Sequence, residues 1–163
     1  MTLPIFIDLD ETLIHTSDPL EKRASDSIEV TVGNQKMFSS LRKNTVVLLE
    51  KLRSRGQLYL ITIASHEYAQ EMNRVFNLGF PEHRIFSRMH IANKQTPDIS
   101  SAKVFLLDNL SRRENRRKIE FLRQISSNII YFQIKGFLNN IYDDLSKEDI
   151  DQILKNLDEQ ISS

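Results

Sequence analysis

The sequence contains no cysteine among its 163 residues. This absence excludes disulfide bonds, thiolate nucleophiles and cysteine-ligated zinc, and it agrees with a reducing compartment. Only four glycines and four prolines are present, so no flexible linker is evident, and no repeat or low-complexity tract divides the chain. With 40 % hydrophobic and 27 % charged residues, the composition predicts one globular domain over residues 1–163, large enough to bury a core.

An excess of charge of either sign is also lacking, because 22 Lys and Arg balance 22 Asp and Glu. A net charge of zero provides no overall field that attracts nucleic acid or a membrane surface. No segment is long and apolar enough to span a bilayer, and the N-terminus lacks the basic region and cleavage site of a signal peptide. We therefore expect an intracellular protein, cytoplasmic or nuclear, that acts as a monomer.

The most informative stretch lies close to the N-terminus. Residues 3–7 form an apolar run that is too short for a helix and is typical of a buried parallel strand. The run ends on Asp8 and Asp10, which project to the same side because side chains alternate along a strand. Two close carboxylates repel unless a cation neutralises them or their protonation states differ. The pair is either an acidic turn or part of a site, and the residues in the rest of the sequence distinguish these two interpretations.

Strand and helix patterns alternate after this stretch. The strict alternation in Ile28–Val32, the turn signal Gly33-Asn34 and the return strand at 35–38 predict a β hairpin, within an insertion at about 16–40. Asn44 is expected to cap a helix that ends at Gly56. Further strands are predicted at 58–63, 84–91, 104–107 and 129–132, and further helices at about 67–77, at 114–125 and after Ser146, where Asp149 suits a capping box.

This order predicts an α/β domain, with a mainly parallel, Rossmann-like sheet flanked by helices and no large cap domain. In such sheets, ligands bind beyond the carboxyl ends of the strands. Asp8, Asp10, Thr62 and Asp108 all lie at or just past the carboxyl ends of predicted strands. We expect their side chains to share one edge.

Carboxylate and amide ligands, with no Cys or His among them, favour Mg²⁺ over zinc or copper. Because Mg²⁺ usually shares a substrate phosphate, phosphoryl chemistry is indicated. An ionised Asp8 can attack phosphorus to give an aspartyl-phosphate, and Asp10 can act as general acid and then general base. Thr62 can donate a hydrogen bond to a phosphoryl oxygen, and Lys94 can neutralise charge that develops on the transferred group.

These residues resemble a known family. The segment DLDETL at 8–13 resembles the first motif of haloacid dehalogenase (HAD) superfamily phosphatases, in the form found in the FCP/SCP branch of small C-terminal-domain phosphatases. TIASHEYA, from Thr62 to Ala69, is similar to the second motif, and LDN at 107–109 is similar to the fourth. Residues 28–38 resemble the inserted hairpin of that branch. The resemblance covers nearly the whole chain.

The resemblance implies a role for each matching residue. Asp8 becomes the nucleophile and a metal ligand, and Asp10 becomes the general acid/base that offers its backbone carbonyl to Mg²⁺. Asp108 and Asn109 take the fourth-motif role at the metal site, with Asn109 as the more direct ligand and Asp108 orienting the lysine or a water. The third-motif lysine is assigned to Lys94, which lies 14 residues before Asp108; Lys103 is the rival, but it is less suited because it directly precedes the strand.

The predicted function is that of a Mg²⁺-dependent phosphoprotein phosphatase, because a hairpin in place of a large cap leaves the site open to a peptide. The sequence does not choose between phosphoserine/threonine and phosphotyrosine. One alternative is a nucleic-acid 3′-phosphatase, supported only by the basic run from Arg112 to Lys118, which is otherwise typical of a solvated helix face. The other is a non-catalytic scaffold that binds a phosphorylated partner, against which the intact Asp8 argues.

Overall fold

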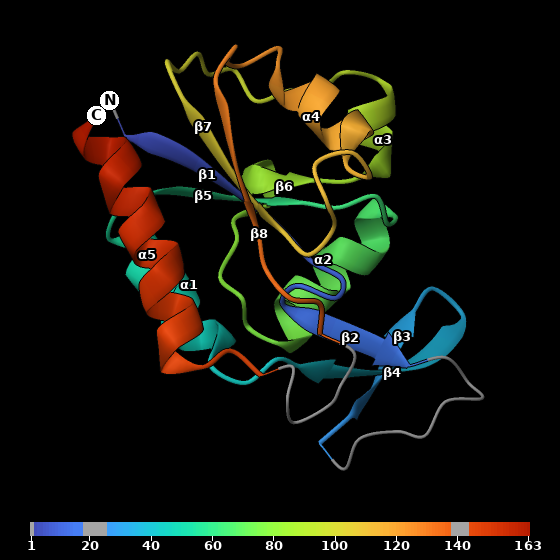
Figure 1. The fold of residues 1–163 in the computed structure, drawn as a ribbon. Helices are drawn as coiled ribbons and strands as arrows, with labels where there is room; N and C mark the ends of the chain where they lie inside the picture. Colours follow the sequence, from blue (N-terminus) through green and yellow to red (C-terminus); the bar gives the residue numbers. More distant parts are fainter. Residues whose placement is uncertain (1, 18–25, 138–143) are drawn as a thin grey trace.

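A five-stranded sheet lies at the centre of the computed structural model, which describes residues 2–17, 26–137 and 144–163 (Figure 1). Each strand pairs in parallel with its neighbour, in the order β6-β5-β1-β7-β8. The predicted α/β class with a mainly parallel sheet is confirmed. The strands are β1 (Leu3–Asp8), β5 (Gly56–Ile61), β6 (Ile85–Phe86), β7 (Val104–Asp108) and β8 (Ile129–Gln133).

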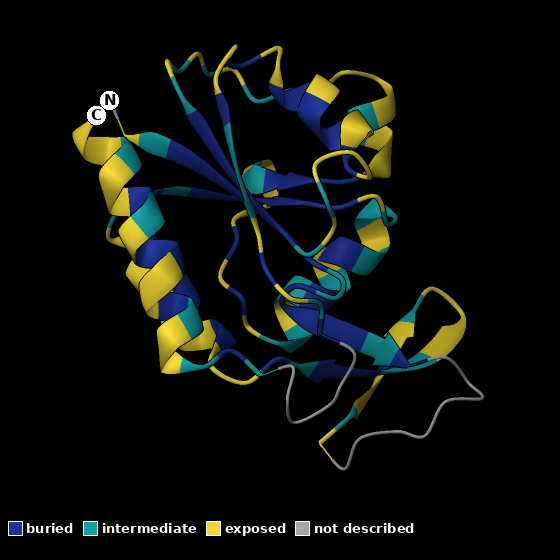
Figure 2. Ribbon diagram, viewed as in Figure 1, coloured by how far each residue is buried: buried dark blue, intermediate teal, exposed yellow. Residues whose placement is uncertain are grey.

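Helices cover both faces of this sheet, and the alternation of side chains along β1 explains why. Ile5 and Ile7 pack into one apolar cluster with α1, α2 and α5, whereas Phe6 packs into a second cluster on the α4 side. Figure 2 shows the buried strands between helices whose outer surfaces are exposed. The helices are α1 (Thr45–Arg53), α2 (His66–Val75), α3 (Arg88–Ala92), α4 (Arg116–Leu122) and α5 (Lys147–Ser162), with a short 3₁₀ turn, η1 (Glu82–Arg84).

A second, smaller sheet follows β1 in the chain. It contains β2 (Ile14–Ser17), β4 (Gln35–Leu41) and β3 (Ile28–Val32), in the order β2-β4-β3, and its strands are antiparallel. Gly33 has a φ of 59°, which its missing side chain permits, and it makes the turn between β3 and β4. The predicted hairpin is therefore present, with a longer return strand. Residues 18–25 of the expected insertion lie outside the described part of the chain.

The start and end of α1 differ from the prediction. Asn44 does not cap the helix with its side chain; its φ is 67°, and its side-chain amide donates to the carbonyl of Leu145 at 2.7 Å. Gly56 belongs to β5 rather than to the helix end. A Cβ on Gly56 would meet the carbonyl oxygen of Leu3 at 2.4 Å, so glycine is needed where β5 lies against β1.

The predicted strand at 84–91 is the largest error in the expected elements. Only Ile85 and Phe86 pair with β5, at the edge of the sheet, and α3 follows at once. Ser87 ends the strand because its backbone N–H donates to the imidazole Nδ1 of His90 at 3.1 Å, within a capping box that starts the helix. Short apolar runs do not distinguish an edge strand from a helix start.

The last helix agrees with its sequence signals. Ser146 accepts a hydrogen bond from the Asp149 amide at 3.1 Å, and the Asp149 carboxylate accepts one from the Ser146 amide at 2.8 Å. This is the predicted capping box. Within the described ranges, no helix has the length and apolarity needed to cross a membrane.

Candidate functional site

The carboxyl ends of three adjacent strands bring the predicted acidic and hydroxyl side chains to one edge of the sheet. Asp8 ends β1, Asp108 ends β7, and Thr62 directly follows β5. β1 lies between the other two strands, with Asp8 opposite Ile61 of β5. Because all three strands run in parallel, their C-terminal residues meet at one edge.

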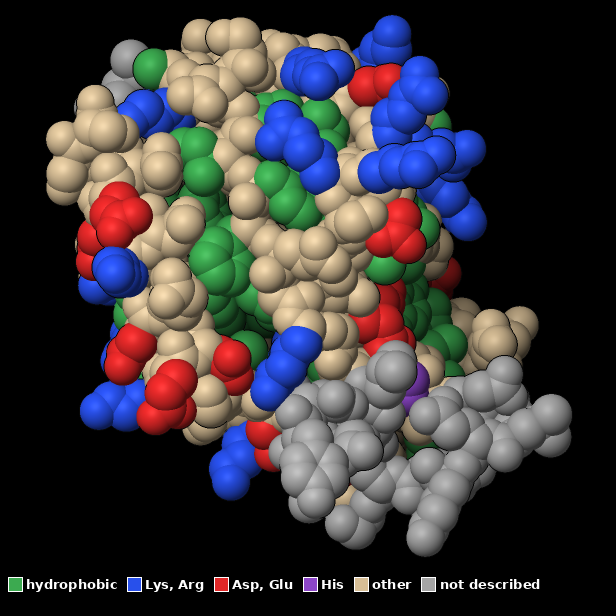
Figure 3. Space-filling model, viewed as in Figure 1, with side chains coloured by type: hydrophobic (Ala, Val, Ile, Leu, Met, Phe, Trp, Pro, Cys, Tyr) green, Lys and Arg blue, Asp and Glu red, His purple; other side chains and the backbone are tan. Residues whose placement is uncertain are grey.

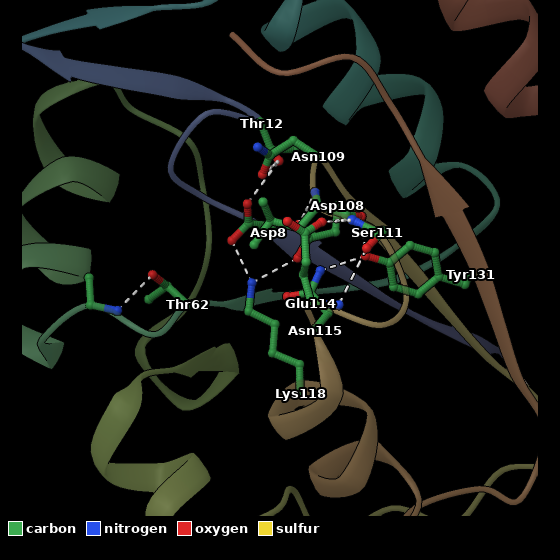
Figure 4. Close-up of polar contacts among 12 residues, drawn as sticks. Asp8, Thr12, Thr62, Asp108, Asn109, Ser111, Glu114, Asn115, Lys118 and Tyr131 are labelled. Atoms are coloured by element: carbon green, nitrogen blue, oxygen red, sulfur yellow. Dashed lines mark hydrogen bonds and ion pairs between the residues drawn. The ribbon is translucent and has the colours of Figure 1, made fainter. Parts of the chain in front are cut away.

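Asp8 is 6 % exposed and both of its oxygens accept hydrogen bonds (Figure 4). The Lys118 ammonium donates to Oδ1 at 2.6 Å, and the Thr12 hydroxyl donates to Oδ2 at 2.8 Å. Burial and the nearby charge of Asp108 raise the pKa of Asp8 to about 6, against the opposing effect of Lys118. A carboxylate with this pKa is ionised at neutral pH.

Lys118 links the two buried carboxylates. It comes from α4, is 2 % exposed, and also donates to Oδ2 of Asp108 at 2.8 Å. Burial alone would lower the pKa of this ammonium, but the charges of Asp8 and Asp108 outweigh burial and raise it. Lys118 is therefore a fixed positive charge between two negative ones.

Asp108 is fully buried, and its second oxygen is also engaged. Oδ1 accepts a hydrogen bond from the backbone N–H of Leu110 at 2.9 Å. This contact turns the chain directly after β7 and brings Asn109 next to Asp8. With its amide nitrogen facing the carboxylates, Asn109 lies 3.0 Å from Oδ2 of Asp8 and 3.3 Å from Oδ1 of Asp108.

Asp10 is held by a separate set of hydroxyl groups. The phenol of Tyr68, on α2, donates to Oδ1 of Asp10 at 2.6 Å. The same phenol lies 2.6 Å from the Thr16 hydroxyl, which is 2.7 Å from the Ser39 hydroxyl. Asp10 is therefore tied to the small sheet as well as to α2.

Burial sets the protonation of Asp10 and Tyr68. It raises the pKa of Asp10 above its ordinary value, against the opposing hydrogen bond from Tyr68 and the charge of Lys118. Burial, the Asp10 charge and the hydrogen bond to it raise the pKa of Tyr68, so this phenol keeps its proton and stays a donor. Asp10 is thus a positioned carboxyl group whose proton affinity suits general acid catalysis better than that of a solvated aspartate.

Thr62 is 1 % exposed, and its hydroxyl oxygen accepts a hydrogen bond from the Ala64 N–H at 3.1 Å. That bond leaves the hydroxyl proton available for a ligand. Figure 4 shows Thr62 on the other side of Asp8 from Asp108.

The donor set at this edge fits a hard divalent cation. Asp8 and Asp108 supply carboxylate oxygens, and Asn109 can supply its amide oxygen by turning its side chain over. The backbone carbonyl of Asp10 lies two residues after Asp8 in the sequence. The described residues contain no group of three His, Cys, Asp or Glu side chains placed to hold a metal ion. Two carboxylates with amide, carbonyl and water oxygens match Mg²⁺, which commonly keeps several of its waters.

The lysine predicted for this site lies elsewhere. Lys94 follows α3, is exposed, and lines a groove with Ile63. Lys103 is at the opposite end of β7, where its ammonium donates to the carbonyl of Gln160 at 2.7 Å. Among the described residues, neither forms an ion pair with Asp8.

Sequence reasoning missed Lys118 because it was grouped with the exposed basic run from Arg112. The spacing of Lys118 relative to the apolar residues that follow it nevertheless indicates that this lysine is buried. Leu122 and Ile125, four and seven residues after Lys118, are buried on the same side of α4 and the turn that follows it. A lone cation in an apolar helical stripe is expensive to bury without a negative partner, so it indicates one across the core.

The sequence matches the model of a known protein family and is similar to a known protein. The model of the family described as NLI interacting factor-like phosphatase matches residues 3–160. A C-terminal domain phosphatase of RNA polymerase II from Caenorhabditis elegans is 27 % identical over 90 residues, which are 53 % of this chain and 13 % of that protein.

Two solved structures share the fold. One is fission yeast RNA polymerase II CTD phosphatase Fcp1 bound to beryllium fluoride, with a TM-score of 0.57, 13 % identity and coverage of 96 % of this chain and 50 % of the other. The second is described as Fcp1, an essential RNA polymerase II CTD phosphatase, with a TM-score of 0.58, 16 % identity and coverage of 98 % and 50 %. The chain thus spans about half of these structures and a smaller part of the curated relative.

Proposed function

Because the chain belongs to the NLI interacting factor-like phosphatase family, we propose that it is a phosphoprotein phosphatase that forms an aspartyl-phosphate on Asp8. The observation that carries the proposal is the geometry around Asp8: a buried, ionised carboxylate with one ammonium on Oδ1 and one hydroxyl on Oδ2. These contacts hold the carboxylate in one orientation, as attack on phosphorus requires.

In the first step, an oxygen of Asp8 forms a bond to phosphorus while the bond from phosphorus to the substrate oxygen breaks. Asp10 gives its proton to that leaving oxygen. In the second step, Asp10 takes a proton from water, whose oxygen attacks phosphorus, and the bond to Asp8 breaks to release phosphate. Thr62 donates a hydrogen bond to a phosphoryl oxygen.

Lys118 takes the charge-neutralising role that the sequence assigned to Lys94. Its ammonium stays beside the oxygen of Asp8 while negative charge moves between the carboxylate and the phosphoryl group. Mg²⁺, held by Asp8, the backbone carbonyl of Asp10, Asp108 and Asn109, would offset the charge of the phosphoryl oxygens.

The proposal is tested by metal removal. The purified protein is assayed for phosphate release from p-nitrophenyl phosphate and from phosphoserine, phosphothreonine and phosphotyrosine peptides, with Mg²⁺ and with EDTA. We expect release with Mg²⁺, loss of release in EDTA and recovery when Mg²⁺ is restored, because the oxygen ligands at the site are matched to this ion. The peptide panel also decides between phosphoserine/threonine and phosphotyrosine.

Other outcomes contradict the proposal, once a 3′-phosphorylated oligonucleotide is added to the panel and peptide binding is measured beside release. Release that EDTA leaves unchanged would exclude the metal site. Binding of phosphopeptides without release would favour a scaffold, and faster release from a 3′-phosphorylated oligonucleotide than from any peptide would favour a nucleic-acid phosphatase.

A second prediction concerns the contact that positions Asp10. Tyr68→Phe removes the hydroxyl that donates to Asp10, so the carboxyl group becomes free to rotate. A hydrogen bond to a charged group is worth about 1.5 kcal/mol, which corresponds to a roughly tenfold lower kcat. We expect that fall for phosphoserine peptides, whose leaving oxygen needs a proton, with KM nearly unchanged.

Tyr59→Phe is the matched control. It removes a buried phenol whose hydroxyl lies 3.1 Å from the side-chain amide of Gln57, away from the acidic edge. Equal steady-state constants for the two variants, or a change in KM alone for Tyr68→Phe, would show that Tyr68 does not position Asp10.

A further inference from the structure

A groove lies between α3 and α4 that the steps above do not use. Its volume is about 990 Å³. Three segments supply most of its lining. They contribute Ile63 after β5, then Arg88, Ile91 and Lys94 on and after α3, and Arg117 and Phe121 on α4. Figure 1 shows α3 and α4 beside each other on the face of the sheet opposite α5.

The groove begins next to the proposed active site on two sides. Ile63 directly follows Thr62, and Arg117 directly precedes Lys118. The start of α3 is tied to the same loop, because the Arg88 backbone N–H donates to the carbonyl of Ala64 at 3.0 Å. A chain whose phosphorylated residue reached Asp8 would therefore have the groove beside its neighbouring residues.

The lining combines an apolar floor with positive charge. Ile63 is 59 % exposed although its side chain is large and apolar, and Phe121 closes the base. Arg88, Lys94 and Arg117 are exposed and, within the described residues, none of them forms an ion pair. Figure 3 shows Lys and Arg side chains gathered at the upper right of the molecule, where α3 and α4 lie.

The carboxylate in the groove lining does not offset this charge. Glu120 is paired with Arg116 at 3.0 Å, so its charge is already neutralised by a cation that does not line the groove. Three cations and exposed apolar side chains complement a ligand that has negative charge next to an apolar residue.

We propose that this groove binds an acidic segment of the phosphoprotein substrate, with at least one apolar side chain, directly beside the phosphorylated residue. This inference rests on the proposed phosphatase function. The groove runs from Arg117, on α4, to Gln124, in the turn that follows the helix, a length of about 10 Å at 1.5 Å per residue. An extended peptide covers that length with about three residues.

The test compares phosphopeptides that differ only in their flanks. One has alanines on both sides of the phosphorylated residue, one has Glu-Leu-Glu before it, and one has Glu-Leu-Glu after it. We expect kcat/KM for one of the two acidic peptides to exceed that of the alanine peptide about tenfold, because two ion pairs and one buried leucine contribute. Equal values for all three would overturn the proposal.

A second experiment removes positive charge from the groove. The double variant Arg88→Gln, Arg117→Gln is expected to bring the ratio of kcat/KM between the acidic and alanine peptides close to one. Arg113→Gln is the matched control, because Arg113 is exposed and does not line the groove. It should keep the ratio, and equal loss of the ratio in this control would mean that overall charge rather than the groove selects the peptide.

A measurement of peptide binding tests the groove separately from the phosphatase function on which this proposal rests. Fluorescence anisotropy with labelled peptides and the Asp8→Asn variant requires no turnover. A Kd about tenfold lower for the acidic peptide supports the groove even if the protein releases no phosphate. Equal Kd values, or tighter binding of a single-stranded oligonucleotide that the double variant abolishes, would overturn it.

Discussion

Asp8→Asn is expected to abolish phosphate release from p-nitrophenyl phosphate and from phosphopeptides, a loss of at least about 10⁴-fold in kcat, as seen when other enzymes lose their nucleophile. The amide cannot form the acyl-phosphate bond, and among the described residues only the Asp8 carboxylate is hydrogen-bonded to both Lys118 and Thr12. Steady-state assays with saturating Mg²⁺ measure the loss, and acid-quenched samples of the unaltered protein should contain phosphate bound to the chain.

The matched control is Asp98→Asn, which makes the same chemical change at an exposed position in the loop after α3. Its kcat should equal that of the unaltered protein. Circular dichroism of Asp8→Asn checks that the variant is folded. If the folded variant still turned over p-nitrophenyl phosphate at a comparable rate, the nucleophile would have to be another residue and the proposed mechanism would be incorrect.

Lys118→Met is expected to lower kcat by about 10²–10³-fold, the usual cost of removing one preorganised electrostatic contact to the reacting group. Methionine has a similar length, but it leaves Asp8 and Asp108 facing each other inside the protein without a cation. Breaking a buried ion pair from one side costs about 3–5 kcal/mol, so the melting temperature should fall as well.

Two other lysines serve as controls, and they separate the competing assignments. Lys94→Met and Lys103→Met remove the same charge from residues that lie outside the acidic cluster, and both are assayed with p-nitrophenyl phosphate, which has no peptide flank to contact Lys94 in the groove. If Lys94 supplied the charge at the reacting phosphoryl group, Lys94→Met would show the large fall in kcat and Lys118→Met would be active.

Stability provides a readout that is independent of turnover. The proposed Mg²⁺ site exists only in the folded protein, so we expect Mg²⁺ to raise the melting temperature of the unaltered protein in a concentration-dependent way. With Lys118→Met the rise should be larger, because the ion then also screens two unpaired carboxylates. An unchanged melting temperature for Lys118→Met would mean that Lys118 does not hold the cluster together.

Lys118→Arg, which keeps the charge but not the shape of the ammonium, should recover stability more than activity.

The sequence by itself determined the parts of this protein that depend on local pattern. The apolar run of β1 and its abrupt end on Asp8 predicted a buried strand with a polar exit, and the structure has both. The capping box of α5 was predicted from Ser146 and Asp149 alone. Parallel strands place their C-terminal residues at one edge, so the meeting of Asp8 and Asp108 followed from strand order.

Only the tertiary structure decided which lysine joins the two carboxylates and how the chain changes direction around them. Lys118 is ten residues after Asp108, and its approach to Asp8 depends on how α4 packs against β1 and β7. Gly56 is required because β5 lies so close to β1 that a Cβ would meet the carbonyl oxygen of Leu3 at 2.4 Å. The physical reason is the same in each case. The contact that fixes the conformation joins residues from different elements of the chain, and the sequence pattern around one residue contains no information about the other.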